Sequence, residues 1–342
     1  MVFNSVGICA FAAIGDGLLA SSLIVDLRRS HPRLKIIVFA TKANLPIFSL
    51  VSGFDELVLV PITSPMAALR EMRAHPVDVL IDTSQWSRIG AILTLLSGAG
   101  FTIGFKTSGQ NRHFSYDFSV KHSSNIHELQ NFWALLGPLG ISAGSLPSVN
   151  LSAISSNDCL NIKQPYLVFH PWASGSHYEL REWPFSSWVE LAQRAMRSGY
   201  GVVISGGPSD IVRAGALVEG IEAAGSRPLV NLAGKSDLRT TAAYLRGAAG
   251  VVSVNTGIMH LAALLDMPLV ALHGPTNPSR WGPIYPGGVN EQNTVVLGPG
   301  LKEGGSYLNL GFEHPANPTY LMDRITVDAV VVALRKLSIN IA

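Results

Sequence analysis

The sequence predicts an α/β protein made of two doubly wound domains, each a parallel sheet covered by helices, that face each other across a cleft. Three observations support this fold class. Short apolar runs alternate with amphipathic segments along the chain, which is the pattern of βαβ units. Residues 137–163 are rich in Ser, Gly and Pro, and the alternation starts afresh after them. The length of 342 residues is long for one core and suits two domains.

The first half of the chain is expected to form one doubly wound sheet. Short apolar runs predict strands at 5–11, 35–40, 56–60, 79–82 and 102–104. Apolar residues at helical spacing predict helices at 18–30, 65–74, 87–97 and 127–136. We therefore expect an N-terminal Rossmann-like domain over 1–155, with residues from 137 onward forming the linker.

The second half repeats this architecture without repeating its residues. Strands are expected at 166–170, 201–205, 229–231 and 251–254, and a further strand follows within 251–283. Helices are expected at 185–198, 210–223, 240–246 and 258–265. A last helix at 326–337 is expected to pack back across the domain junction. The predicted domains are therefore 1–155, 156–325 and a C-terminal helical segment, 326–342.

The composition excludes several classes of protein. Hydrophobic residues make up 47% and charged residues 14% of the chain, which suits a large buried sheet better than a disordered chain. The net charge of +2 and the absence of a Lys/Arg run argue against a nucleic-acid partner. Cys9 and Cys159 give neither a disulfide framework nor metal-ligand spacing, so a reducing compartment is expected.

The N-terminal residues predict a cytoplasmic protein. Residues 1–13 are apolar but lack a basic region, and Asp16 interrupts the run. Neither a secretory signal nor a spanning helix fits this pattern. The composition still allows peripheral docking on the inner membrane, where a membrane-embedded acceptor is reached from the cytoplasmic face.

The most informative stretch is 251–283, which runs from a strand through a tight polar turn into a helix. The turn is Asn255-Thr256-Gly257, and the free backbone N–H groups and dipole of the helix after it favour an anion. His260, in the first helical turn, adds a further donor. From the residues alone, an ordinary turn stays open, with Asn255 or Thr256 as N-cap and His260 half buried.

This stretch resembles the signature of the ADP-heptose glycosyltransferases, the lipopolysaccharide heptosyltransferases of glycosyltransferase family 9. Their strand ends in (D/N)-(T/S)-G-x-x-H-L-A-A, and G-P-T-x-P-x-R-W-G-P follows. Thr256, Gly257 and His260 match this signature, whereas Asn255 stands where many members have aspartate. The resemblance implies a GT-B fold, with an acceptor-side N-terminal domain and a nucleotide-sugar-binding C-terminal domain.

Asp16 is the candidate catalytic residue. It lies in AIGDGLLA, residues 13–20, which is similar to the family's G-D-x-L-L motif. From the residues alone, Asp16 is interpreted as the N-cap of a helix beginning at Leu18. The resemblance implies instead that it is the general base, which takes the proton of the acceptor hydroxyl as the new C–O bond forms.

Further motifs imply contacts with the donor. Arg181 begins R-E-W-P, similar to the family's (K/R)-x-W-P, and would clamp the diphosphate, although a solvated loop charge stays open. Asp210 ends a strand-G-G-P-x-D motif and would either bind a ribose hydroxyl or cap its own helix. Ser236 belongs to residues 233–236, which match a family loop, and the resemblance implies that this loop meets the edge of the donor base. Trp172 replaces a common family glycine and would narrow the pocket.

Basic residues of the first half are candidates for binding the acceptor. Arg88, Lys106 and Arg112, with Lys42 as a further candidate, would suit an acceptor that bears carboxylates or phosphates, such as an inner-core lipopolysaccharide sugar. Most of these residues are expected to be ordinary surface charges.

The resemblance therefore implies an inverting glycosyltransferase that moves heptose from ADP-heptose to a hydroxyl of a lipopolysaccharide core or related glycan. No metal and no other cofactor is expected, because the chain lacks a D-x-D motif that would hold a divalent ion on the diphosphate. Two alternatives stay open: a non-catalytic homologue that binds a nucleotide sugar or glycan, and a sugar-nucleotide epimerase. A dehydrogenase is disfavoured because no G-x-G-x-x-G loop follows the first strand.

Overall fold

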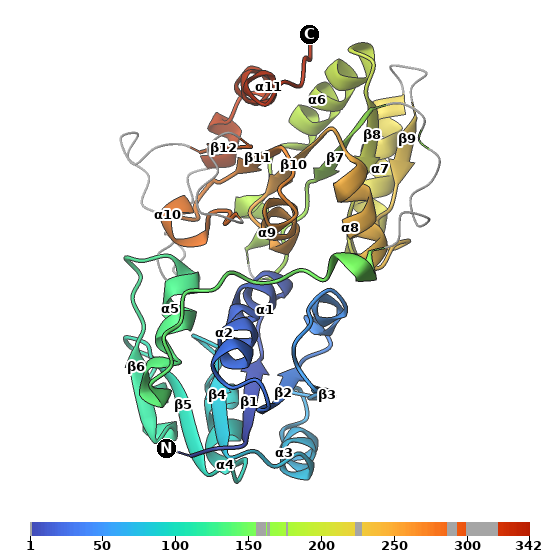
Figure 1. The fold of residues 1–342 in the computed structure, drawn as a ribbon. Helices are drawn as coiled ribbons and strands as arrows, with labels where there is room; N and C mark the ends of the chain where they lie inside the picture. The colour runs from blue at the N-terminus through green and yellow to red at the C-terminus, as the bar shows by residue number, and fades with distance from the viewer. Residues whose placement is uncertain are drawn as a thin grey trace. The chain divides into compact units, whose positions relative to one another are not determined.

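The chain forms two compact units, Met1–Asn150 and Leu151–Ala342, each built around one six-stranded sheet (Figure 1). The computed structural model describes residues 2–154, 162, 165–175, 177–222, 228–285, 293–298 and 321–342. The predicted boundary between 155 and 156 lies outside the described residues, as does part of the predicted linker.

The first unit is a parallel sheet in the order β3-β2-β1-β4-β5-β6. Its strands are β1 Ser5–Ala10, β2 Lys35–Ala40, β3 Glu56–Leu59, β4 Val79–Asp82, β5 Phe101–Lys106 and β6 Phe118–Lys121. Its helices are α1 Ile14–Ala20, α2 Ser22–Ser30, α3 Pro65–Ala74, α4 Arg88–Leu96 and α5 Glu128–Ala134, with 3-10 turns η1 Leu45–Ser49, η2 Arg112–Ser115 and η3 Gly137–Leu139.

The predicted helix at 18–30 is two helices, and the first of them begins at Ile14. The break falls at Ser21, whose hydroxyl donates to the Leu18 carbonyl at 2.6 Å. Such back-bonding by serine competes with the backbone ladder and bends a helix. The sequence pattern also missed β6, an edge strand whose residues are all at least partly exposed and which therefore lacks the apolar run of a buried strand.

The second unit is a parallel sheet in the order β12-β11-β10-β7-β8-β9. Its strands are β7 Tyr166–His170, β8 Gly201–Ile204, β9 Leu229–Asn231, β10 Gly250–Val254, β11 Leu269–Leu272 and β12 Thr294–Leu297. Its helices are α6 Phe185–Arg197, α7 Ile211–Glu222, α8 Leu238–Gly247, α9 Gly257–Leu264, α10 Pro278–Trp281 and α11 Val327–Lys336, with 3-10 turns η4 Leu151–Ala153, η6 Tyr178–Arg181, η7 Pro208–Asp210 and η9 Leu321–Arg324. The sequence pattern missed β12 and α10, and Ala223 of the predicted helix 210–223 lies outside the described residues.

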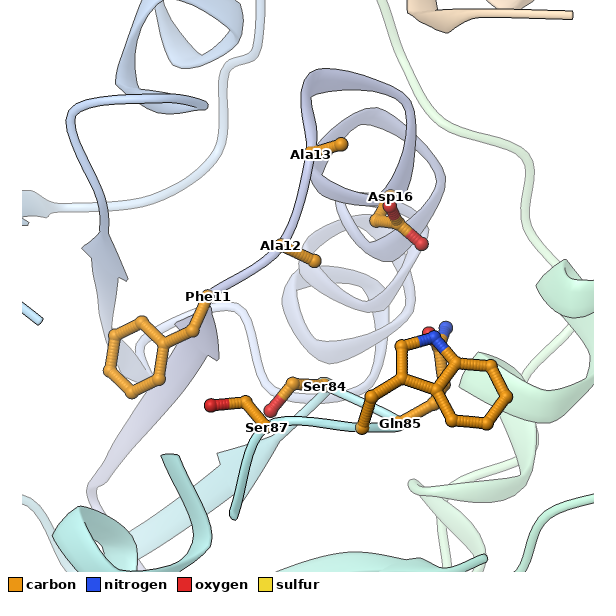
Figure 2. A pocket seen from close by; sticks show the side chains of 8 residues that line it. Phe11, Ala12, Ala13, Asp16, Ser84, Gln85 and Ser87 are labelled. Carbon is orange, nitrogen blue, oxygen red and sulfur yellow. The ribbon is translucent and has the colours of Figure 1, made fainter. Parts of the chain in front are cut away.

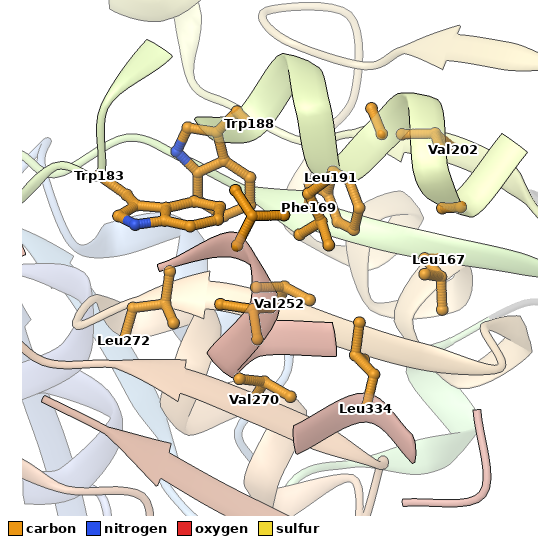
Figure 3. Packing of buried hydrophobic residues seen from close by; sticks show 14 of the residues in the cluster. Leu167, Phe169, Trp183, Trp188, Leu191, Val202, Val252, Val270, Leu272 and Leu334 are labelled. Atoms are coloured by element: carbon orange, nitrogen blue, oxygen red, sulfur yellow. The ribbon is translucent and has the colours of Figure 1, made fainter. Parts of the chain in front are cut away.

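The C-terminal helix α11 packs on its own unit, against α6, β11 and β12. Leu334 of α11 belongs to the same buried cluster as Leu191 of α6 and Val270 of β11 (Figure 3). The Trp183 indole N–H ties the chain before α11 to the loop before α6, because it donates to the Ile325 carbonyl at 2.7 Å. The predicted packing of this helix across the domain junction stays a prediction.

Each sheet has one point at which the strand order reverses. In the first unit the chain winds outward from β1 to β3 and then returns to place β4 on the other side of β1. In the second unit the same reversal separates β7 from β10. In open parallel sheets, ligands bind at the carboxyl ends of the strands beside such a reversal. The topology therefore marks two places to search for a site.

Among the described helices, none combines the length and the apolar character that crossing a bilayer requires.

Candidate active site

The reversal point of the first sheet holds a cavity of about 400 Å³. Its lining comes from the two segments that follow β1 and β4: Phe11, Ala12, Ala13, Asp16, Ser84, Gln85, Trp86 and Ser87. Figure 2 shows Asp16, from α1, and Gln85, from the segment after β4, pointing toward one another. The predicted catalytic carboxylate thus lies in a pocket at the carboxyl ends of the central strands.

Asp16 lies in the first turn of α1 and is not an N-cap. The N-cap residue is Ala13, with no side-chain capping bond, so the interpretation of Asp16 as the cap of a helix beginning at Leu18 is wrong. Gly17 allows α1 to approach η1 closely, since a Cβ there would lie 3.3 Å from the Asn44 side-chain nitrogen. The early helix start turns Asp16 toward the pocket.

The surroundings of Asp16 raise its pKa from 3.8 to about 6. Asp16 keeps some exposed surface at the pocket, but protein atoms surround its carboxylate, and this burial is the largest cause. The second cause is the negative charge of Glu128. A hydrogen bond from the Gln85 side chain and backbone N–H groups at Ala13 and Asp16 act in the opposite direction. A carboxylate with this pKa is suited to accept a proton near neutral pH.

Behind Asp16 lies a buried polar network that the sequence interpretation missed. Gln85 Nε2 donates to Glu128 Oε1 at 2.8 Å, and His122 Nε2 lies 2.7 Å from the same oxygen. All three side chains are buried. The polar run at 82–85, directly after a buried strand, was the available signal, because the carboxyl end of a central strand is where ligand-binding groups gather.

Arg112 is buried and structural, which corrects the expectation of a surface charge. It is 2% exposed, and its Nη2 lies 2.7 Å from Asp82 Oδ2 at the end of β4. It also donates to the backbone carbonyl and hydroxyl of Ser84 and to the Tyr116 hydroxyl. The guanidinium therefore holds the segment that forms one wall of the pocket.

The other candidate acceptor residues are exposed. Arg88 is the first residue of α4 and directly follows Ser87, which lines the pocket. Lys106 ends β5, and Lys42 follows β2. Of these residues, Arg88 is the one adjacent in sequence to the pocket wall.

At the reversal point of the second sheet, α9 begins with an uncapped turn. Thr256 is the N-cap residue, but its side chain makes no capping bond, and among the described residues its hydroxyl has no partner. Asn255 Nδ2 donates instead to the Thr276 hydroxyl at 2.8 Å. The alternative in which either side chain caps this helix is therefore wrong, and the backbone N–H groups at Gly257 and beyond keep their anion-binding character.

His260 lies in the first turn of α9 and is 3% exposed, so it is buried, not half buried. The histidine at the end of β7, His170, also lies at this reversal point, and burial lowers its pKa to about 4. Its Nδ1 lies 2.9 Å from the Ser205 hydroxyl. His170 is therefore neutral at physiological pH, a feature that the sequence interpretation did not include.

Arg181 ends η6 and is partly buried. Its Nη2 donates to the Ser174 carbonyl, in the segment after β7. A Cβ at Gly175 would lie 3.9 Å from the same guanidinium. The cation thus lies beside one of the two segments that flank the reversal point.

Asp210 caps the turn in which it lies. Its Oδ2 accepts from the Gly207 N–H at 2.8 Å, and its Oδ1 lies 2.7 Å from Arg213 Nη2. The Arg213 guanidinium also pairs with Glu182 at 2.8 Å and lies 4.8 Å from the ring centre of Trp172. Both carboxylate oxygens of Asp210 therefore have protein partners.

Trp172 is 7% exposed and packs over Gly206, where an added Cβ would lie 2.8 Å from the indole. The tryptophan thus fills space within the buried cluster of the second unit, and the glycine after β8 makes room for it. Ser236, after β9, bonds to the Leu232 carbonyl at 3.2 Å and to the Thr241 hydroxyl at 3.1 Å.

Comparisons with known proteins bear on this geometry. A family model described as glycosyltransferase family 9 (heptosyltransferase) matches residues 66–302. Lipopolysaccharide heptosyltransferase 2 of Escherichia coli (strain K12) is 30% identical over 296 residues, which cover 79% of this chain and 83% of the relative. Lipopolysaccharide heptosyltransferase 1 of Pseudomonas aeruginosa is 38% identical over a shorter span of 144 residues, which covers 42% of this chain and 38% of the relative.

Solved structures share the fold. The structure of E. coli ADP-heptose lps heptosyltransferase II matches with a TM-score of 0.76 and 20% identity, covering 97% of this chain and 98% of that one. The E. coli heptosyltransferase WaaC with ADP-2-deoxy-2-fluoro heptose matches with a TM-score of 0.69 and 22% identity, covering 97% and 99%. These similarities confirm the predicted GT-B fold class.

Proposed function

Because the chain belongs to glycosyltransferase family 9, the heptosyltransferase family, we propose that it moves heptose from ADP-heptose to a hydroxyl of a lipopolysaccharide core. The names of its relatives and the ADP-heptose analogue held by one structural neighbour support the donor and the acceptor class. The observation that carries the proposal is the pocket of the first unit, in which burial and the nearby Glu128 charge raise the pKa of Asp16 to about 6.

The acceptor hydroxyl reacts at Asp16. The oxygen of the acceptor hydroxyl attacks C1 of the heptose on the face opposite the diphosphate, so that the configuration at C1 is inverted. The C1–O bond to the β-phosphate breaks, and ADP leaves with the electron pair. The hydroxyl proton goes to the Asp16 carboxylate, whose raised pKa matches this task. This chemistry makes the N-terminal domain, proposed as 1–155, the acceptor side.

The donor diphosphate binds at the start of α9, in the domain proposed as 156–325. The backbone N–H groups beyond Thr256 and the positive end of the helix dipole favour the two phosphates. Arg181 and His260 add donors to the leaving group, and Asn255 and Gly257 shape the turn. These groups stabilise the negative charge that develops on ADP in the transition state.

The nucleoside end of the donor lies toward the segments after β8 and β9, which contain Asp210 and Ser236. On the acceptor side, Arg88 is the proposed contact to an anionic core sugar, because it is exposed and follows the pocket wall, and Lys106 is a second exposed cation. Arg112 is left out of this acceptor surface, since its guanidinium is buried on Asp82. Transfer is proposed to take place in the cytoplasm, with peripheral access to the inner membrane.

A transfer assay tests this function. The purified chain is incubated with ADP-heptose and a heptose-deficient lipopolysaccharide core, and the glycan is analysed by mass spectrometry. The expected result is one added heptose and stoichiometric ADP. Donor binding without transfer would instead identify a non-catalytic binding protein, and isomerised donor would identify an epimerase.

Replacing Arg181 by Ala is expected to weaken ADP binding by about tenfold or more, because a charge-assisted bond to a phosphate contributes about 1.5–3 kcal/mol. Isothermal titration calorimetry with ADP measures the change. Arg197→Ala, which removes a cation from the last turn of α6, is the matched control and is expected to leave the affinity unchanged. Equal ADP affinities for wild type and Arg181→Ala would contradict the assignment.

Removal of divalent metal is expected to leave the transfer rate unchanged. The proposed leaving-group stabilisation comes from Arg181, His260 and the start of α9, which require no metal bridge. Rates measured with excess EDTA and with added Mg²⁺ check this expectation. A rate that falls with EDTA and returns with Mg²⁺ would show that the ion belongs to the donor complex.

A further inference from the structure

The Gln85 amide connects Glu128 to the pocket that holds Asp16. Asp16 lies on α1 and Glu128 begins α5, and these helices pack together. Gln85 lines the same pocket as Asp16 and points toward it (Figure 2), and its Nε2 donates to Glu128 Oε1 at 2.8 Å. An amide nitrogen has two hydrogens, so one side chain is able to serve both carboxylates.

Further contacts hold the Glu128 carboxylate in place. His122 Nε2 lies 2.7 Å from Glu128 Oε1, and the imidazole is held edge-on against the rings of Phe105 and Trp86. Asn131 Nδ2 lies 3.4 Å from the second carboxylate oxygen. Glu128 has no exposed surface, so its orientation is set by these contacts and not by solvent.

We propose that Gln85 and Glu128 are positioning residues for the catalytic base, with His122 holding Glu128 in place. The Gln85 amide, anchored on Glu128, fixes the direction of the Asp16 carboxylate at the pocket. This inference rests on the proposed role of Asp16 as the base.

Glu128 and Gln85 shift the pKa of Asp16 in opposite directions. The charge of Glu128 raises the pKa of Asp16, because two negative charges close together disfavour each other. The Gln85 hydrogen bond lowers it, because it stabilises the ionised form.

Other charged groups near α1 already have partners. On α2, Asp26 and Arg29 pair with each other at 2.6 Å, and Arg28 pairs with Asp55 at 2.8 Å. η1 has no titratable side chain, and Cys9 of β1 is buried. Beneath the segment after β4, Asp82 is paired with Arg112. Among the described residues, Glu128 is thus the charge that acts directly on Asp16.

The test is the pH dependence of kcat/KM for two variants. Glu128→Gln keeps an oxygen that accepts from Gln85 and His122 but removes the charge, and its acid limb is expected to shift down by about one pH unit. Gln85→Met removes the amide at similar length, and its acid limb is expected to shift up. Asp26→Asn, which neutralises another buried carboxylate of this unit, is the matched control and should leave the acid limb unchanged.

A ¹³C NMR titration of the Asp16 carboxyl, identified by its absence in Asp16→Asn, gives a readout independent of turnover. Opposite shifts in the two variants support the inference, and coincident titrations in wild type and both variants overturn it. If one variant fails to fold, the sign of the shift in the other decides. Full turnover by Asp16→Asn would refute Asp16 as base while leaving the NMR test of the coupling intact.

Discussion

Replacing Asp16 by Asn is expected to lower kcat by about 10²–10⁴-fold while leaving the affinity for the donor unchanged. Asparagine has nearly the same shape as aspartate but does not take the proton of the acceptor hydroxyl. The residues proposed to bind the donor diphosphate lie in the other domain, and the substitution does not alter them. Steady-state kinetics and calorimetry with ADP measure the two quantities, and full turnover by the variant would refute the base assignment.

The same substitution is expected to stabilise the protein at neutral pH. The pKa of Asp16 is raised from 3.8 to about 6, so between these values the folded chain binds more protons than the unfolded chain, and stability falls as pH rises. The loss is complete about one pH unit above this folded-state pKa. The Tm of Asp16→Asn should therefore exceed that of wild type at pH 8 and approach it near pH 4.

Asp26→Asn provides the matched control for this stability effect. Asp26 is also a buried carboxylate of the first unit, but it accepts from the N–H groups of Gly144 and Ser145 and pairs with Arg29. Its replacement by Asn is expected to lower Tm, because the amide cannot pair with Arg29 and has one acceptor oxygen fewer for these N–H groups. A gain in Tm in the inactive Asp16→Asn variant and a loss in the active Asp26→Asn variant together identify Asp16 as a residue retained for function at a cost in stability.

Replacing Arg112 by Met is expected to lower the free energy of unfolding by about 3–5 kcal/mol. The side chains of Arg112 and Asp82 have no exposed surface, and their ion pair at 2.7 Å includes the Tyr116 hydroxyl, which donates to the same Asp82 oxygen. Removing the cation leaves a buried carboxylate without its counter-charge. Urea denaturation of the purified chain measures the change.

Two further variants give this prediction its controls. In the double variant Arg112→Met, Asp82→Asn the buried charge is gone, so part of the lost stability should return. Arg88→Met removes an exposed cation of the same unit and is expected to change the free energy of unfolding by less than about 0.5 kcal/mol. A similarly small effect for Arg112→Met would mean that the pair contributes little to the stability of the first unit.

Most strands were predictable because central parallel strands are buried on both faces and appear as apolar runs. β2, β4 and β7 have the predicted bounds, and their residues other than Lys35 are buried. The edge strand β12 was missed because its residues are all partly or fully exposed. The helix predicted at 18–30 failed at Ser21, where one hydroxyl bond to Leu18 outweighs the periodicity of the apolar residues.

Local sequence also located the proposed base and the proposed diphosphate turn at the ends of central strands. The turn 255–257 directly follows β10, Asp16 lies in the helix after β1, and the carboxyl ends of parallel strands meet at one edge of a sheet. The residues that surround these positions could not be predicted from local sequence. The partner of Gln85 is 43 residues away in the chain, and the partner of Arg112 is 30 residues away.

The sequence by itself therefore determined the two-domain α/β architecture, the family and the positions of the proposed base and diphosphate turn, because these depend on periodicity, on strand ends and on contiguous motifs. Only the tertiary structure decided which charges are buried, which amide connects Glu128 to the Asp16 pocket, and that Gly206 makes room for Trp172. Charge interactions depend on distance and burial, and packing brings together residues that no local pattern relates.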